Sequence, residues 1–279
     1  MPELDLTGNN GGHPVEETGV EHAAQNHQNT DDLALLESAV RAAGDIARKF
    51  YGGDFKRWSK EGGSPVSEAD LAVDRYLQST LLAARPGYGW LSEESPDNKA
   101  RLTTKRVFVV DPIDGTVAFL KQRPHFTICA AVVEAGRPLS AIVFNPISEE
   151  CFAAVLGGGA TLNGAPIHVT ARGAIAGARM LGPKSTFETG WPEVEVTSFS
   201  SIAYRIVLVA AGRYDAAVSI SAKRDWDLAA ADLIVREAGG SLTDRSGATL
   251  YYNRASATQN SAIAAGAPLH ALLLAHLRQ

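Results

Sequence analysis

The segment from residue 106 to residue 156 is the part of the sequence that most restricts how this chain can fold. Residues 106–110 form a short β-rich run that ends at Asp111-Pro112. Proline has no amide hydrogen to give to a neighbouring strand, which favours a strand end at that point. Three further strands are predicted after it, at 126–133, 139–144 and 150–156. Gly- and Pro-containing turns separate these three, so the pattern predicts a β-meander.

Two helices are expected before this sheet. The first is predicted from an N-cap at Thr30 to Gly52-Gly53, because apolar residues recur there every three or four positions. The second begins at Ser67, where Asp70 completes a capping box, and it runs to Pro86-Gly87.

After about residue 178 the pattern changes to alternating helices and strands. The expected elements are a helix at 201–212, a strand at 216–220, a helix at 227–238, a strand at 262–265 and a helix at 268–278. The sequence therefore predicts an α/β protein whose first half is α+β and whose second half is α/β.

Three segments are expected in the 279-residue chain. Residues 1–29 contain few large apolar side chains, so we expect a disordered leader. Residues 30–175 form the α+β half with the metal-binding motifs, and residues 176–279 form the α/β half that completes the active site.

Composition excludes several classes of protein. The chain has 26 Lys and Arg against 31 Asp and Glu, a net charge of −5, which argues against a nucleic-acid polymer or an anionic membrane as partner. No apolar run reaches the roughly 18 residues that a membrane helix needs. Cys129 and Cys151 lie in apolar runs, as expected for reduced thiols in a cytoplasmic protein.

Carboxylates interrupt otherwise apolar segments at five positions. Asp111 and Asp114 flank a Pro-Ile turn, Glu93 lies upstream, Asp227 begins an apolar helix and Asp70 opens another. Half-buried carboxylates that lie close together repel one another unless cations intervene. Oxygen ligands of this kind suit magnesium.

Gly115 and Thr116 give the same turn a second property. Glycine lets backbone approach a ligand closely, and free amides at 115–116 can hold phosphate oxygens. These features predict a phosphate-ester site, while ordinary turn and capping roles remain an alternative for the same residues.

Four motifs resemble signatures of the inositol monophosphatase superfamily of magnesium-dependent, lithium-sensitive phosphomonoesterases. They are SPVSEAD (64–70), SEES (92–95), DPIDGT (111–116) and WDLAAADLIVREAGG (226–240). They occur in the order of the family, and the similarity runs from about residue 31 to the C-terminus. The resemblance implies a layered αβαβα sandwich with the active site between the two halves.

The resemblance also implies site residues and their roles. Two or three magnesium ions would be held by Glu93, Asp111, the Ile113 carbonyl, Asp114 and Asp227. Asp70 and Thr116 would position and help deprotonate the attacking water, with Glu93 in the same catalytic group, and the amides of Gly115 and Thr116 would bind phosphate. Lys60 matches a lysine near the metals in relatives, although a solvated lysine is an equal alternative.

Substrate choice rests on finer resemblances. Bacterial 3′(2′),5′-bisphosphate nucleotidases have a basic residue where this chain has Arg205, and they share its Asp225-Trp226-Asp227 and roughly its Pro183-Lys184-Ser185. We therefore expect adenosine 3′,5′-bisphosphate to be converted to AMP and phosphate. Positive charge for the second phosphate would come from Arg205, Lys184, Lys223 or Arg224, unless these are solvated surface charges.

The inositol enzymes supply the alternative. Residues 208–215 resemble theirs, but Ser219 replaces a glutamate that contacts inositol hydroxyls. An inositol-1-phosphatase or a broader sugar-phosphate phosphatase is therefore the second reading, and a catalytically inactive ligand-binding protein is a third. The expected partner is a small phosphorylated substrate, and a homodimer is left open.

Overall fold

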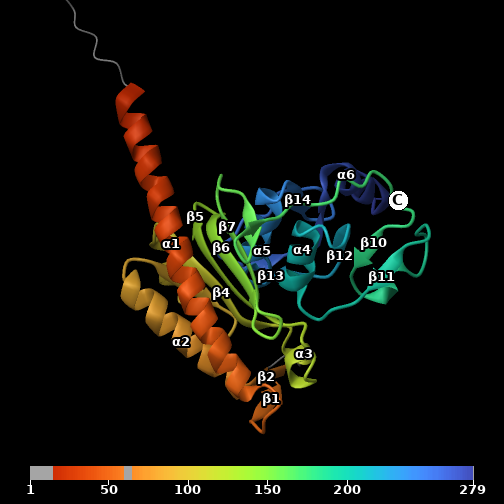
Figure 1. The fold of residues 1–279 in the computed structure, drawn as a ribbon. Coiled ribbons are helices and arrows are strands. Elements are labelled where there is room, and N and C mark those ends of the chain that lie inside the picture. The colour runs from red at the N-terminus through yellow and green to blue at the C-terminus, as the bar shows by residue number, and fades with distance from the viewer. Residues whose placement is uncertain (1–14, 60–64, 279) are drawn as a thin grey trace, which may run out of the picture.

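The computed structural model describes residues 15–59 and 65–278, which form five layers (Figure 1). Helices α1 (Val15–Phe50) and α2 (Glu68–Ala84) cover one face of a seven-stranded sheet. Helices α4 (Ile202–Ala210) and α5 (Asp225–Glu237) lie between that sheet and a five-stranded one, whose outer face carries α6 (Ala267–His276). The predicted αβαβα sandwich is confirmed.

The large sheet has the strand order β3-β4-β5-β6-β7-β8-β9. Its strands are β3 (Gly89–Ser92), β4 (Arg106–Asp114), β5 (Thr127–Glu134), β6 (Arg137–Asn145), β7 (Glu150–Val155), β8 (Ala160–Leu162) and β9 (Ala165–Pro166). The antiparallel meander β5-β6-β7 is confirmed. The predicted strand end at Asp111-Pro112 is wrong, because β4 continues to Asp114. The pairing of β4 with β5 is irregular between Asp111 and Asp114, so Pro112 does not have to pair with a residue of β5.

The small sheet has the order β11-β10-β12-β16-β14. Its strands are β10 (Arg179–Leu181), β11 (Glu195–Thr197), β12 (Ala216–Ser219), β14 (Gly240–Thr243) and β16 (Ala262–Gly266). The short elements are β1 (Arg57–Ser59), β2 (Pro65–Ser67), α3 (Thr116–Leu120), β13 (Lys223–Arg224), β15 (Thr258–Gln259) and the 3₁₀ helices η1 (Lys99–Thr103) and η2 (Lys184–Phe187). No helix among the described residues is long and apolar enough to cross a membrane.

Helix α1 begins at Val15 and not at Thr30, so the expected disorder of residues 1–29 is wrong for residues 15–29. Polar contacts hold the helix to the sheet near the expected start. Buried Arg106 of β4 donates to the side chains of Asn29 at 2.9 Å and Asp32 at 2.8 Å, which ties this part of the helix to the sheet. Residues 1–14 and Lys60 lie outside the described residues.

Candidate active site

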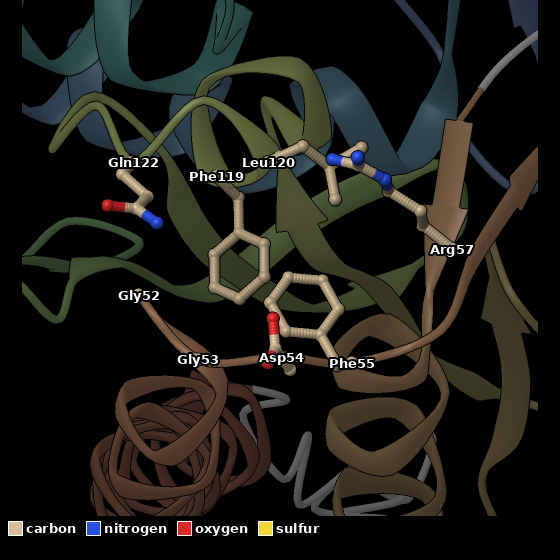
Figure 2. A pocket seen from close by; sticks show the side chains of 8 residues that line it. All are labelled: Gly52, Gly53, Asp54, Phe55, Arg57, Phe119, Leu120 and Gln122. Atoms are coloured by element: carbon tan, nitrogen blue, oxygen red, sulfur yellow. The ribbon is translucent and has the colours of Figure 1, made fainter.

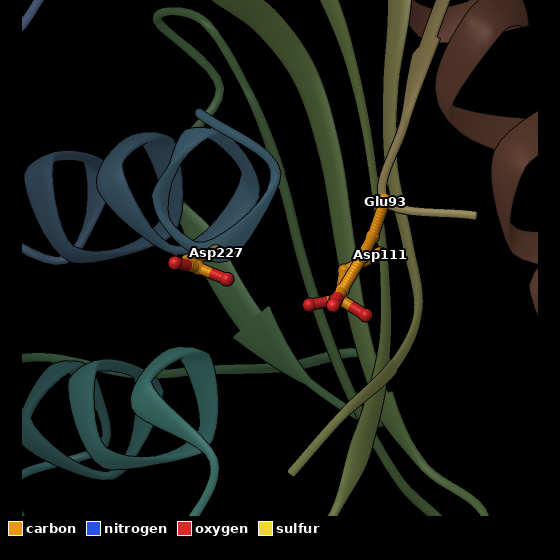
Figure 3. Close-up of side chains that lie close together, drawn as sticks. All are labelled: Glu93, Asp111 and Asp227. Carbon is orange, nitrogen blue, oxygen red and sulfur yellow. The ribbon is translucent and has the colours of Figure 1, made fainter. Parts of the chain in front are cut away.

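Three carboxylates from distant parts of the chain converge between the two sheets. Glu93 directly follows β3, Asp111 lies in β4, and Asp227 lies in the first turn of α5. One carboxylate oxygen of each lies within 4.8 Å of the others, and Figure 3 shows the side chains facing a common space. The spacing suits oxygen ligands that share a cation.

Asp114 lies beside this carboxylate group and is turned toward the start of α4. Its Oδ2 accepts hydrogen bonds from Ser201 Oγ at 2.5 Å and Ala203 N at 2.7 Å, and Oδ1 accepts one from Ile202 N at 3.3 Å. The negative charge of Asp114 is close enough to raise the pKa of Asp227. Sequence motifs alone did not indicate this difference between Asp114 and the other three carboxylates.

One observation in particular indicates that these residues could hold a divalent cation. Asp111 Oδ1 accepts a hydrogen bond from Ile113 N at 3.0 Å, but Asp111 Oδ2 is buried and has no hydrogen-bond partner among the described residues. A buried carboxylate oxygen without a donor is costly. A hard cation bound by oxygen ligands would satisfy it.

Burial and mutual repulsion make these carboxylates resist ionisation. Burial is the main cause that raises the pKa of Asp111 well above its ordinary value, and the charges of Glu93 and Asp114 add to it. Burial likewise raises the pKa of Asp227 to about 7 and that of Asp114 to about 6, while the Ser201 hydrogen bond acts in the opposite direction on Asp114. A bound cation would reverse this balance.

We expect the metal-free protein to lose stability as the pH rises from about 4 to about 7. Asp114 and Asp227 have higher pKa values in the folded chain than in the unfolded one, so the folded state binds more protons across this window. With a chelator present, Tm will fall between about pH 4 and about pH 7, and added Mg²⁺ will reduce the fall. The Asp227→Asn variant should show a smaller fall without metal, and an unchanged one would contradict this account.

The turn that follows β4 brings together three more of the predicted residues. Thr116 Oγ1 lies 3.2 Å from Asp70 Oδ1 and 3.2 Å from the carbonyl oxygen of Ile113. Asp70 also accepts from Ser67 N at 2.8 Å and from Ser67 Oγ at 2.5 Å, which is the predicted capping region at the start of α2. Asp70 is therefore held by its own helix and aimed at Thr116.

Position 115 needs a glycine because this turn lies very close to the start of α4. Its φ is +95°, and a Cβ there would lie 3.0 Å from Ser201 N and 3.1 Å from Ser201 Cβ. A side chain would therefore push the turn away from the helix start that holds Asp114.

The structure separates the predicted cations. Arg205 of α4 is buried, donates from Nε to the Ser201 carbonyl at 3.2 Å, and lies close enough to Asp114 and Asp227 for their charges to act on its pKa, which burial lowers. Lys223 of β13 lies close enough to the same two carboxylates for their charges to act on its pKa, which burial lowers, and its Nζ donates to Ser221 Oγ at 2.9 Å. Lys184 is exposed on η2, and within the described part of the chain no ion pair links it to any of the site carboxylates.

Asp225 and Trp226 are occupied by structural contacts. Asp225 is fully buried and accepts from Asn253 N and Gln259 Nε2, each at 2.7 Å. Trp226 packs against the hydrophobic core, and the Arg224 guanidinium lies 5.9 Å from its ring centre. The acidic residue before Trp226 is therefore a structural feature and not a substrate contact.

One hollow in the described surface borders the carboxylate group. It has a volume of about 480 Å³ and includes Glu93, Arg224 and Trp226 in its lining. Another, of about 220 Å³, lies between the loop after α1 and helix α3 (Figure 2), and none of the predicted site residues lines it. Only the first is placed to receive part of a ligand bound at the carboxylates.

The comparisons with known proteins agree with this geometry. The model of the inositol monophosphatase family matches residues 28–279. The chain belongs to the inositol monophosphatase family. It is 34% identical over 237 residues to an inositol-1-monophosphatase of Rhizobium meliloti (strain 1021), covering 76% of this chain and 85% of that protein. It is also 34% identical over 235 residues to Nus factor SuhB of Escherichia coli (strain K12), covering 78% and 87%.

The fold agrees as well. The extragenic suppressor protein SuhB of Bartonella henselae superposes with a TM-score of 0.79 at 28% identity, over 89% of this chain and 99% of that one. This family member is a phosphatase that hydrolyses phosphate monoesters. The family generally uses divalent metal ions and acts on small phosphorylated substrates.

Proposed function

We propose that the chain is a magnesium-dependent phosphatase of small polyol phosphates, with inositol 1-phosphate as its substrate. The observation that carries the proposal is the group of Glu93, Asp111 and Asp227 around the partnerless Oδ2 of Asp111. The relative named inositol-1-monophosphatase, at 34% identity, supports this substrate, and on that ground we place it ahead of the bisphosphate that Arg205 and Ser219 led us to expect.

The proposed metal ligands are Glu93, Asp111, Asp114, Asp227 and the carbonyl of Ile113, for two or three magnesium ions. When bound, the ions lower the pKa of water and neutralise charge on the phosphoryl and leaving oxygens. We assign the amides of Gly115 and Thr116 to the phosphate oxygens, because the two residues directly follow Asp114 and are only half-buried.

Asp70 and Thr116 are assigned to the attacking water. Thr116 Oγ1 lies 3.2 Å from Asp70 Oδ1, so a water held by the threonine hydroxyl can pass its proton to the carboxylate. Burial raises the pKa of Asp70, which makes it a stronger base than an exposed aspartate. In phosphoryl transfer, such side chains contribute mainly by positioning the attacking water and by accepting its proton.

A second candidate substrate is adenosine 3′,5′-bisphosphate, favoured by the two cations Arg205 and Lys223. Both lie close enough to Asp114 and Asp227 for the charges to interact, so an ester bound at the metals could place a second anionic group against them. Arginine is well suited to phosphate because its planar guanidinium binds two oxygens at once. Lys184 receives no such support from its exposed position on η2.

Parallel assays of phosphate release with Mg²⁺ test both substrates. We expect the larger kcat/KM for inositol 1-phosphate, whereas a larger value for the bisphosphate would select the second candidate. Release from neither ester would overturn the proposal.

If the bisphosphate binds at Arg205, Arg205→Met should lower the kcat/KM for the bisphosphate by about 10-fold or more relative to that for the inositol ester. Lys184→Met should change neither value. Equal losses on both esters would remove Arg205 from substrate recognition.

A further inference from the structure

The hydroxyl of Ser201 lies where the two halves of the molecule meet. Ser201 is fully buried and is the N-cap of α4, where its Oγ accepts a hydrogen bond from Tyr204 N at 2.9 Å. The same Oγ donates to Asp114 Oδ2 at 2.5 Å, although 87 residues separate the two in sequence. One hydroxyl thus serves a helix end and a site carboxylate at once.

The surroundings leave Asp114 little freedom to rotate. Ala203 N binds the same Oδ2 as Ser201, and Ile202 N binds Oδ1, so both oxygens are held by the first turn of α4. Thr127 Oγ1 lies 3.2 Å from Ser201 Oγ, which fixes the hydroxyl from the side of β5. The orientation of the carboxylate is therefore set by α4 as well as by its own strand.

We infer that Ser201 is a positioning residue whose hydroxyl orients the Asp114 carboxylate for metal binding, in addition to capping α4. The inference rests on the proposed role of Asp114 as a metal ligand. Hydrogen-bond partners of metal-binding carboxylates fix the direction of the remaining lone pairs, and their loss typically weakens metal affinity or activity by about 10–100-fold. Helix capping alone would not change the affinity in this way.

Two substitutions separate the roles. Glycine is nearly as good an N-cap as serine, whereas alanine is a poor one, and neither can donate to Asp114. Ser201→Gly and Ser201→Ala should therefore raise the Kd for Mg²⁺, measured by isothermal titration calorimetry, by similar factors of about 10 or more. Without Mg²⁺, the alanine variant should melt about 2–4 °C below the glycine variant.

Ser140→Ala is the matched control. Ser140 is also fully buried. Its hydroxyl donates to the carbonyl of Asn29 at 2.7 Å and not to any of the site carboxylates. Its loss should leave the Kd for Mg²⁺ unchanged. The inference is overturned if Ser201→Gly binds Mg²⁺ as the wild type does and only the poorly capped alanine variant is weakened. Failure of the wild type to bind Mg²⁺ would instead overturn the proposed metal site, and the inference with it.

Discussion

Asp111→Asn will stabilise the metal-free protein and abolish most of its phosphatase activity. Asparagine keeps the Oδ1 acceptor for Ile113 N, at 3.0 Å in the wild type, while it removes a buried charge that Glu93 and Asp114 repel. Its amide can donate toward the carboxylates of Glu93 and Asp227, whose oxygens lie within 4.8 Å. We therefore expect a higher Tm in the presence of a chelator.

Activity should move in the opposite direction. A neutral amide cannot replace a carboxylate that binds a cation, and metal ions contribute several kcal/mol to stabilising transition-state charge. We expect kcat with Mg²⁺ to fall by about 10³-fold or more, and the rise in Tm on adding Mg²⁺ to shrink. Thermal melts with and without Mg²⁺, together with phosphate release, give both readings from one variant.

Asp225→Asn is the matched control for this prediction. Asp225 is equally buried and lies two positions from Asp227, but both its oxygens accept hydrogen bonds, from Asn253 N and Gln259 Nε2. The variant should lose stability with and without Mg²⁺, because one acceptor is replaced by a donor, and it should keep its kcat. An Asp111→Asn protein that is less stable than wild type without metal, or as active with it, would contradict our account of the carboxylate group.

The helices and strands were largely predictable because their main signals are local, whereas the layered αβαβα arrangement was implied only by the family resemblance. The meander from Thr127 to Val155 shows strand composition and turn residues at short range, and the capping residues of α2 lie within one helical turn. The meeting of the acidic residues at one site was likewise implied by the resemblance of the four motifs to the family. The structure accordingly places Glu93, Asp111 and Asp227 together.

Features that depend on distant partners were not predictable. Strand β3 has only four residues, and its parallel pairing with β4 gives no turn signal. The contact of Asn29 in α1 with the sheet depends on Arg106, a residue 77 positions away. The Ser201–Asp114 hydrogen bond likewise reaches across 87 positions, and the only local signal at Ser201 is that serine is a good N-cap.

The two candidate cations show the same limit. Arg205 and Lys184 are equally basic in the sequence, and resemblance supported both as ligands for a second phosphate. Burial separates them, because α4 lies between the two sheets and carries Arg205 toward Asp114, while η2 leaves Lys184 in solvent. A residue type predicts the chemistry a side chain can do, and tertiary packing decides whether it reaches the site.

Asp70→Asn should lower kcat by about 10²- to 10⁴-fold, the range typical for loss of a general base, with little change in the affinity for Mg²⁺. Asparagine can still accept the hydrogen bond from Ser67 N, at 2.8 Å, so α2 should keep its start and the fold its stability. Phosphate release and calorimetric Mg²⁺ titration would separate loss of a base from loss of a metal ligand. A large rise in the Kd for Mg²⁺ would reassign Asp70 to metal binding.

Thr116 provides the test that the two side chains act together. Thr116→Val keeps the shape of the side chain but removes the hydroxyl that lies 3.2 Å from Asp70 Oδ1, whereas Thr116→Ser keeps the hydroxyl. We expect the valine variant to approach the low kcat of Asp70→Asn, and the serine variant to keep a kcat near that of the wild type. The double variant Asp70→Asn with Thr116→Val should have a kcat hardly lower than that of either single variant. Non-additivity of this kind marks groups that act as a unit. Additive losses, or a serine variant as slow as the valine variant, would show that Thr116 and Asp70 do not handle the same water.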